Sequence, residues 1–209
     1  RRKKMERSRG KSGMHFGKIS RRSVPDNGRN GSTAEIEEKT MKRTEQYARF
    51  PLFVSMEGRR ILFFGAGEVA ARRIDILLKY GAKIEVVAPG ISEKKQKQFA
   101  EWIKAEKIHY CKKVYEEGDL QTGVQMVFAA TNNKEINEEI TAQCKRRRIP
   151  VNNASNPMSC DFFFPSVIQE EGIIIGITGD GKNHGKVKKV RKKIEEWIRR
   201  EKKEEAGCL

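Results

Sequence analysis

The sequence contains no long hydrophobic run, only four cysteines and only three histidines, and each shortage narrows what the protein can be. No apolar stretch approaches the roughly 20 residues of a transmembrane helix, and none forms the core of a signal peptide. The cysteines are far apart and make no C-x-x-C pair, and the histidines are too scattered for a zinc site. We therefore expect a cytoplasmic protein with reduced thiols, no membrane segment and no metal ligands.

Acidic residues are too few to balance the basic ones, and the excess lies at the two ends of the 209-residue chain, whose net charge is +16. Residues 1–49 carry 15 Lys and Arg against 6 Asp and Glu, and residues 182–209 carry 11 against 5. Residues 50–181 carry 18 against 17 and are nearly neutral. Because a nucleic-acid-binding domain normally has a basic face on its folded part, we expect no nucleic-acid partner.

The first 40 residues show no apolar periodicity and are rich in Arg, Lys, Gly, Ser and Asn. A segment of this kind cannot bury enough apolar surface to offset the entropy of ordering, so we expect a disordered basic extension over residues 1–46. Three alternatives stay open at this point: a basic arm for phosphate groups, an organelle-targeting sequence, and a natural start at Met41.

Beyond residue 46, short apolar runs alternate with helical patterns. The runs predict strands at residues 50–54, 60–64, 83–88, 107–111, 125–130 and 149–152. Helices are predicted over residues 67–81, 92–106 and 131–148. This alternation predicts an α/β, Rossmann-like domain with a parallel sheet over residues 47–153.

A glycine motif follows the strand predicted at residues 60–64. Gly65 permits a tight turn, Gly67 allows a phosphate to approach the backbone, and Ala70 keeps the helix close to the strand. The free N–H groups of the first helical turn then face the phosphates, with the helix dipole behind them. This succession of strand, turn and helix predicts a dinucleotide-binding site.

The residues at the ends of the second and fourth parallel strands decide neither the choice between NAD and NADP nor the role of the turn at residues 131–132. NAD-binding folds usually place an acidic residue there for the ribose hydroxyls, whereas an arginine often accommodates the 2′-phosphate of NADP. Here Ala88 and Pro89 occupy the end of the strand and Glu85 lies within it, so the choice stays open. Thr131 and Asn132 follow the fourth parallel strand, where ligands bind in such sheets, although an Asn-rich helix cap explains them equally well.

The alternation ends after residue 153. Apolar residues at 161–168 and 173–177 flank a Glu-Glu-Gly turn, which predicts a β-hairpin. No helix of its own covers this hairpin, so we expect a second subunit to bury it and the protein to be a homodimer. Residues 154–209 are thus predicted to form a dimerisation hairpin and a C-terminal basic helix.

The basic helix is predicted over residues 186–205, after the glycine-rich loop at 178–185. Its apolar residues are sparse and suffice for one docked face. Its Lys and Arg residues form either a solvated face or, together with the loop, a site for carboxylates.

Five short motifs occur in order along the chain: Phe50-Pro-Leu-Phe53, Gly65-Ala-Gly-Glu-Val-Ala-Ala-Arg72, Val86-Val-Ala-Pro89, Ala129-Ala-Thr131 and Cys160-Asp-Phe-Phe-Phe-Pro165. In this order they resemble the siroheme synthase amino-terminal family, whose members are precorrin-2 dehydrogenases and in some cases also sirohydrochlorin ferrochelatases. The resemblance covers about residues 47–195. It also accounts for the apolar hairpin, since this family dimerises through that region.

The resemblance implies that NAD⁺ takes a hydride from precorrin-2 to give sirohydrochlorin, for siroheme or cobalamin synthesis. It further implies cofactor contacts from the glycine turn and from the ends of the second and fourth parallel strands. These cofactor-binding residues are Gly65, Ala66, Gly67, Glu68, Val69, Pro89, Gly90, Thr131 and Asn132. The substrate would be a tetrapyrrole rich in carboxylates, which suits Lys182, His184 and the basic final helix.

One position departs from the family pattern. Relatives read Val-Asn-Val-Val-Asp after the fifth parallel strand, and that aspartate is the proposed general base and chelatase residue; here Ser155 stands in its place. A serine hydroxyl does not accept a proton near neutral pH unless another base activates it, and Asp161 and His184 are the nearby candidates.

This substitution affects the two family activities differently. Hydride transfer depends mainly on the cofactor, whereas metal insertion needs a ligand that guides the ion and takes protons. We therefore expect precorrin-2 dehydrogenation, with Ser155 at the catalytic position, rather than ferrochelatase activity. The alternative is a non-catalytic nucleotide- or tetrapyrrole-binding module, which a serine in the aspartate's place would suit.

Overall fold

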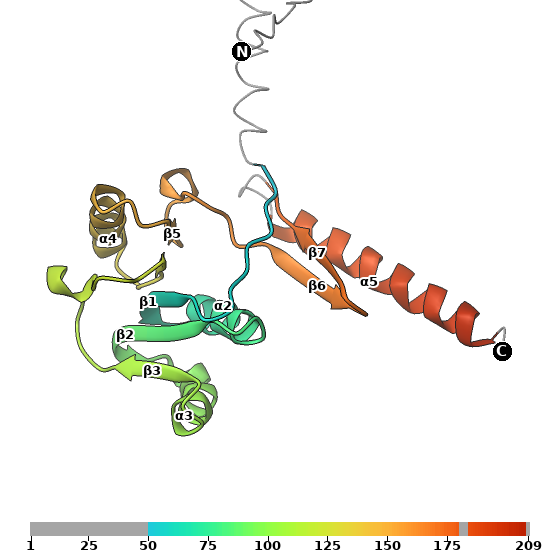
Figure 1. Cartoon of the computed structure of the whole chain (residues 1–209), viewed down its shortest axis with the longest axis horizontal. Helices are drawn as coiled ribbons and strands as arrows, with labels where there is room; N and C mark the ends of the chain where they lie inside the picture. The colour runs from blue at the N-terminus through green and yellow to red at the C-terminus, as the bar shows by residue number, and fades with distance from the viewer. Residues whose placement is uncertain (1–49, 180–183, 208–209) are drawn as a thin grey trace, which may run out of the picture. The chain divides into compact units, whose positions relative to one another are not determined.

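The computed structural model of the chain describes residues 50–179 and 184–207, without the side chains of residue 184 and residues 203–207. The predicted basic extension and Lys182 lie outside these residues. In the described part, an α/β sheet comes first, and a two-stranded hairpin and a long helix follow (Figure 1). The predicted succession of a Rossmann-like sheet, a hairpin and a C-terminal helix is confirmed.

Five parallel strands form the sheet. They are β1 (Arg60–Ala66), β2 (Lys83–Ile91), β3 (Ile108–Cys111), β4 (Met126–Ala129) and β5 (Val151–Asn153). Their order in space is β3-β2-β1-β4-β5, and every neighbouring pair is parallel. The winding reverses between β3 and β4, so the carboxyl ends of β1 and β4 lie side by side, which is where open sheets of this kind bind ligands.

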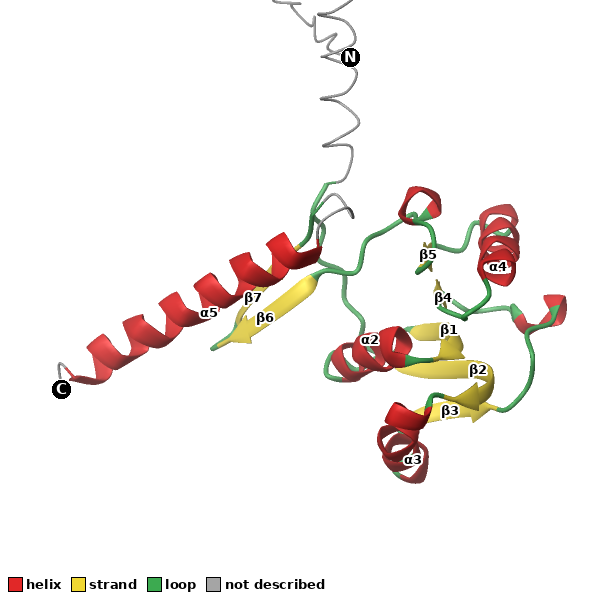
Figure 2. Cartoon of the chain, turned by 180° about the vertical axis from the view of Figure 1, so that it is seen from behind, coloured by secondary structure: helices red, strands yellow, loops and turns green. Residues whose placement is uncertain are grey.

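Helices cover both faces of the sheet. Figure 2 shows them alternating with the strands: α2 (Glu68–Leu78), α3 (Gln96–Lys104) and α4 (Lys134–Arg146). Three 3₁₀ turns complete the connections: η1 (Glu93–Lys95), η2 (Glu117–Asp119) and η3 (Pro157–Ser159). Along β1, Ile61 and Phe63 pack with α2 and α3, whereas Leu62 and Phe64 pack with α4. Burial on both faces explains why β1 is a continuous apolar run.

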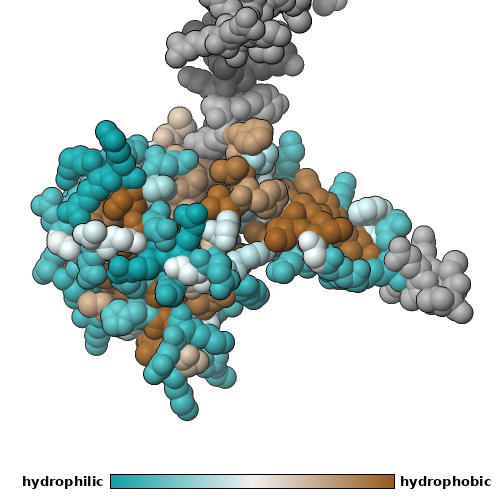
Figure 3. All heavy atoms as spheres, viewed as in Figure 1, coloured by the Kyte–Doolittle hydropathy of each residue, from teal (hydrophilic) through white to brown (hydrophobic). Residues whose placement is uncertain are grey.

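The C-terminal part consists of an antiparallel hairpin and one helix. Strands β6 (Ser166–Glu170) and β7 (Ile173–Ile177) are joined by Glu171 and Gly172, both with positive φ. Helix α5 (His184–Gly207) packs on β6, and Lys202 forms ion pairs with Glu170 and Glu171. Apolar side chains gather over this region (Figure 3), and Ile173 and Ile174 are 64% and 40% exposed.

The segment that leads into the hairpin differs from the prediction. Residues 161–165 were expected in the first hairpin strand, but β6 begins only at Ser166. Instead, the rings of Phe162 and Phe164 pack edge-on against Phe128 of β4, with centroids 5.4 and 5.8 Å away. These rings anchor the segment before β6 to the core of the sheet. The apolar pattern alone does not distinguish such core packing from the pairing of a strand.

The strand predicted at residues 50–54 is wrong. This segment has no strand partner within the described residues, and Pro51 has no N–H to donate to a ladder. The side chains of Phe50, Leu52 and Phe53 are 86%, 75% and 69% exposed. An apolar run forms a strand only where a sheet edge is available, and the edges of this sheet are β3 and β5.

The turn after β1 requires glycine at its first position. Gly65 has φ +104°, a conformation that side-chain-bearing residues rarely adopt, and a Cβ there would lie 2.3 Å from the carbonyl oxygen of Ala130. Gly67 differs, because its φ of −91° suits any residue and nothing lies within 4 Å of a Cβ placed on it. The first glycine is thus needed for packing, and the second leaves space open.

We therefore expect Gly65→Ala to lower the free energy of unfolding by at least about 3 kcal/mol, through backbone strain and the clash with Ala130. Urea denaturation followed by circular dichroism measures this change. Gly67→Ala is the matched control and should change the free energy by less than about 1 kcal/mol. Equal losses in the two variants would contradict this account of the turn.

Candidate functional site

A cavity of about 270 Å³ opens at the carboxyl ends of β1, β2 and β4, and we call it the strand-end cavity. Its lining comes from the glycine turn, from the tip of β2, from the loop after β3 and from the turn after β4. The lining residues are Gly65, Ala66, Gly67, Val87, Ala88, Pro89, Gly90, Ser92, Val114, Tyr115, Ala130, Thr131, Asn132, Asn133 and Ile136. It therefore brings together seven of the nine predicted cofactor residues, although they come from three separate parts of the sequence.

The other two predicted residues, Glu68 and Val69, do not line this cavity. They begin α2, and their side chains point to a different hollow on the other side of that helix. Val69 is 40% exposed. Only their backbone N–H groups, in the first turn of α2, remain suited to a phosphate.

Hydrogen bonds hold the rim of the strand-end cavity in place. Ser92 N–H donates to the carbonyl of Ala66 at 3.1 Å, and Ala130 N–H donates to the carbonyl of Phe64 at 2.8 Å. The tips of β2 and β4 are therefore tied to β1. In front of them, the open space beside Gly67 faces the N-terminus of α2, whose unpaired N–H groups and dipole favour an anion. The residues present thus fit the pyrophosphate of a dinucleotide.

No charged side chain occurs among the described residues that line the strand-end cavity. The nearest ion pair in sequence, between Glu68 and Lys94 at 3.3 Å, is exposed. Glu85, the acidic residue within β2, is held by Arg60 at 2.8 Å and serves the sheet rather than a ribose. The lining accordingly offers backbone groups and uncharged side chains to a ligand.

The turn after β4 combines a helix cap with a ligand surface. The Asn133 side chain accepts a hydrogen bond from Ile136 N–H at 3.0 Å and so caps α4. Thr131, Asn132 and Asn133 all line the cavity. Both interpretations of this Asn-rich turn therefore hold, and Asn133 combines the two roles.

Asn137, which the sequence analysis overlooked, links this turn to Ser155. Its side chain is completely buried in α4. Its Oδ1 accepts hydrogen bonds from the amide and the hydroxyl of Thr131 at 3.0 and 2.8 Å. Its Nδ2 donates to the Thr131 carbonyl at 3.1 Å and to Ser155 Oγ at 2.5 Å. Asn137 is one of several polar residues in α4, so the sequence offers no signal that distinguishes it.

Ser155 lies half-buried just after β5, outside the strand-end cavity. No carboxylate or imidazole contacts its hydroxyl among the described side chains; Asn137 is its partner. Asp161, a candidate base, uses a carboxylate oxygen to accept a hydrogen bond from Val151 N–H at 3.0 Å. His184 begins α5, but its side chain, like the whole of Lys182, lies outside the described residues.

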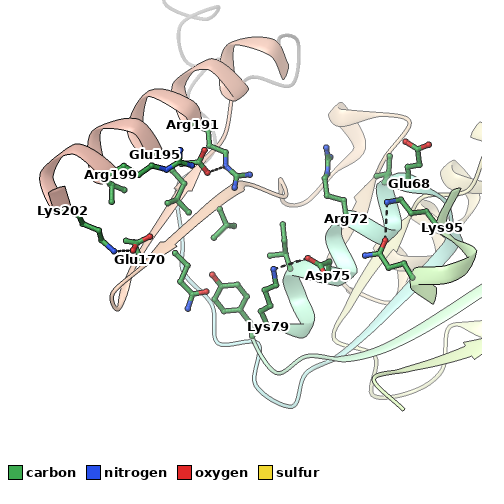
Figure 4. Close-up of a pocket in the computed structure, with 18 residues that line it drawn as sticks. Glu68, Arg72, Asp75, Lys79, Lys95, Glu170, Arg191, Glu195, Arg199 and Lys202 are labelled. Atoms are coloured by element: carbon green, nitrogen blue, oxygen red, sulfur yellow. Dashed lines mark hydrogen bonds and ion pairs between the residues drawn. The ribbon is translucent and has the colours of Figure 1, made fainter. Parts of the chain in front are cut away.

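A larger hollow, of about 1000 Å³, lies between α2 and the hairpin with α5, and we call it the charged hollow. Figure 4 shows its charged side chains, several of which are already paired. Asp75 contacts Lys79 at 3.2 Å and Arg191 contacts Glu195 at 2.8 Å. The charges on α2 recur at helical spacing, which is the signal that could have predicted this face. The hollow mixes both signs and so favours no single class of charged ligand.

Arg73 is a second polar residue that the sequence analysis overlooked; it is half-buried, and its Nε and Nη1 are shielded from solvent. Its guanidinium lies 5.4 and 5.7 Å from the ring centroids of Phe128 and Phe164. Its Nε and Nη1 have no hydrogen-bond partner among the described residues. Burial, with a smaller contribution from Arg72, lowers the pKa of Arg73 to about 10, so it stays charged at neutral pH. It joins α2 to the segment that leads into the hairpin.

No three His, Cys, Asp or Glu side chains in residues 50–179 and 184–207 gather closely enough to hold a metal ion. Over the same residues, no helix combines the length and apolar character needed to cross a membrane.

Comparisons with known proteins agree with this geometry. Residues 52–166 match a family model described as putative NAD(P)-binding. A probable multifunctional siroheme biosynthesis protein HemA from Ruminiclostridium josui is 36% identical over 71% of this chain and 28% of its own length. A siroheme synthase from Ectopseudomonas mendocina (strain ymp) is 36% identical over 71% of this chain and 30% of its own. The chain thus spans less than a third of these curated relatives.

A solved structure extends the likeness from sequence to fold. The precorrin-2 dehydrogenase SirC superposes with a TM-score of 0.60 and is 27% identical. The match covers 70% of this chain and 69% of SirC. Since the family model covers more than half of the chain, the chain belongs to the putative NAD(P)-binding family, and its relatives identify it as a member of the siroheme synthase amino-terminal family.

Proposed function

We propose that this protein is a precorrin-2 dehydrogenase that uses NAD⁺ and produces sirohydrochlorin for siroheme or cobalamin synthesis. One observation carries the proposal: the strand-end cavity joins the glycine turn, the tip of β2 and the turn after β4 at the switch point of the sheet. The likeness to SirC supports the substrate. The other activities of the siroheme synthases are not included, because the chain spans so little of their length.

The chain's own residues would bind and orient the reactants. The backbone N–H groups that open α2 would hold the pyrophosphate, with Gly65, Ala66 and Gly67 forming the turn beneath it. Pro89 and Gly90 would pass the adenosine ribose. Thr131 and Asn132 would lie beside the nicotinamide. When bound, NAD⁺ supplies the acceptor for the hydride.

NAD is proposed over NADP because of the charges around the strand-end cavity. Binding of a 2′-phosphate commonly relies on an arginine near the tip of β2. Among the described residues, the cavity lining includes no cation, and Lys94 is paired with Glu68. The uncharged ribose hydroxyls of NAD need no such partner.

Ser155 supports the dehydrogenase over the ferrochelatase. Its hydroxyl is not a base at neutral pH, and Asn137, its partner, cannot take a proton from it. The same observation favours a second candidate, a non-catalytic module that binds a nucleotide or a tetrapyrrole without turnover.

The surroundings of the site complete the proposal. Lys182, His184 and the basic face of α5 would attract the carboxylates of the tetrapyrrole.

Residues 1–46 would be a basic extension, residues 47–153 the nucleotide-binding domain and residues 154–209 the dimerisation part. The protein would work in the cytoplasm as a homodimer.

Dimerisation is proposed from the exposed face of the hairpin. Ile173 and Ile174 of β7 are 64% and 40% exposed on opposite faces of the hairpin, and Figure 3 shows apolar side chains gathered over this region. An apolar face of this kind usually marks an interaction surface. A second copy brings an identical face, so a two-fold interface buries both.

The activity test is incubation of the protein with precorrin-2 and NAD⁺. We expect NADH absorbance to rise together with the absorption spectrum of sirohydrochlorin. If NAD⁺ binds but no NADH forms, the non-catalytic module is the better description. If NADP⁺ supports the reaction and NAD⁺ does not, the assignment of the cofactor is wrong.

Gly67→Val should raise the Kd for NAD⁺ at least about tenfold, because its side chain fills the open space before α2. Isothermal titration calorimetry measures the affinity. The midpoint of urea denaturation should move little, since no atom lies within 4 Å of a Cβ at this position. Unchanged affinity would mean that the phosphates bind elsewhere.

Ile173→Lys should convert a dimer into a monomer, because it places a charge in the proposed interface. Light scattering coupled to gel filtration measures the mass. Ile103→Lys on α3 is the matched control, since Ile103 is also exposed, at 38%, and lies on the nucleotide-binding domain. A monomeric wild-type protein, or dissociation by the control alone, would refute the interface.

A further inference from the structure

The orientation of the Asn137 amide is fixed by two backbone groups. The amide of Thr131 can only donate, so the atom 3.0 Å from it must be Oδ1. The carbonyl of Thr131 can only accept, so the atom 3.1 Å from it must be Nδ2. Both groups assign the same orientation, and the complete burial of Asn137 prevents water from taking over either bond.

This orientation decides the role of the Ser155 hydroxyl. Because Nδ2 of Asn137 donates to Ser155 Oγ at 2.5 Å, the serine oxygen is the acceptor in that bond. Its own hydrogen must then point elsewhere, and no described group accepts it. Ser155 is half-buried and so presents a free O–H donor at the surface.

The backbone around Ser155 is held just as firmly. Asn153 Oδ1 accepts hydrogen bonds from the amides of Ser155 and Asn156 at 2.8 and 3.2 Å. Asn153 Nδ2 donates to Thr141 Oγ1 at 3.2 Å, and that hydroxyl donates to the carbonyl of Asn137 at 2.7 Å. The loop after β5 is therefore clamped to α4, which fixes the position of the Ser155 backbone.

The position of this donor indicates which reactant it meets. Ser155 follows β5, whereas the strand-end cavity is formed at the ends of β1, β2 and β4. The hydroxyl is thus beyond the cavity, on the side of β4 away from the glycine turn. A ligand group that reaches it belongs to the second reactant rather than to the nucleotide.

We propose that Asn137 is a positioning residue that fixes Ser155 as a hydrogen-bond donor to a carboxylate of the tetrapyrrole. This rests on the substrate class of the proposed function, because carboxylates are acceptors at neutral pH and such a ligand carries many of them. Asn137 also contacts Thr131, so one buried amide sets the geometry of both reactant sites.

The test compares variants by their affinity for sirohydrochlorin, the proposed product, measured by quenching of tryptophan fluorescence. Ser155→Ala removes the donor. Asn137→Asp keeps the acceptor for Thr131 but replaces the donor, so that Ser155 donates inward to the new carboxylate. We expect each variant to weaken binding about tenfold and the double variant to be no weaker than either single one. The Kd for NAD⁺ should stay the same in Ser155→Ala, which leaves the bonds between Asn137 and Thr131 in place.

Two controls separate this role from a structural one. Gln143→Glu makes the same amide-to-carboxylate change at a buried position of α4 with no bond to Ser155, and it should leave the affinity for sirohydrochlorin unchanged. Ser155→Thr and Ser155→Val differ only in the hydroxyl, so the first should bind within about threefold of wild type and the second about tenfold more weakly. The comparison of Ser155→Thr with Ser155→Val tests the role of the hydroxyl even if Asn137→Asp does not fold.

Additive losses, equal affinities of the Thr and Val variants, or a parallel loss of NAD⁺ affinity in Ser155→Ala would overturn the proposal. So would a wild-type protein that binds no sirohydrochlorin. The readout requires no turnover. A protein that binds both ligands but forms no NADH would therefore refute the dehydrogenase while leaving the role of Asn137 intact.

Discussion

The close approach of the turn after β1 to the end of β4 is the constraint on which the site depends. Gly65 has no side chain, so the carbonyl of Ala130 lies where a Cβ would stand. This contact places Thr131 and Asn132 beside the glycine turn, although they are more than 60 residues away in sequence. The N-terminus of α2 then faces a cavity whose far wall comes from β4. Without this approach, the glycine motif would be an ordinary turn.

Much of the sheet could be predicted because its signals are local. The apolar run of Ile61–Phe64 is buried on both faces, and the glycine turn directly follows it, so sequence order alone indicates strand, turn and helix. The residues at Phe50–Phe53 misled the same reasoning, because their pairing depends on a sheet edge that the pattern does not reveal. Glu68 and Val69 were assigned to the cofactor by motif, yet the helix turns their side chains away.

Two polar residues, Asn137 and Arg73, could not be recognised in this way. Each is one of several polar residues in its helix, so nothing in the local pattern indicates what it contacts. Their roles arise from contacts across the fold: Asn137 bonds to Thr131 and Ser155, and Arg73 packs on two phenylalanine rings. Buried polar groups need partners, so such residues become evident only when tertiary neighbours are known. Ser155 could be located from the motif, but its partner could not.

The central claim is that backbone amides at the start of α2 hold a dinucleotide in the strand-end cavity. The most direct test is a titration of the isotopically labelled protein with NAD⁺, followed by amide proton and nitrogen resonances in two-dimensional NMR spectra. This account predicts the largest shifts at the amides of Gly67, Glu68 and Val69, with smaller shifts at Gly90 and Thr131. Shifts confined to residues of the charged hollow, or no shifts at Gly67–Val69 at saturating NAD⁺, would contradict it.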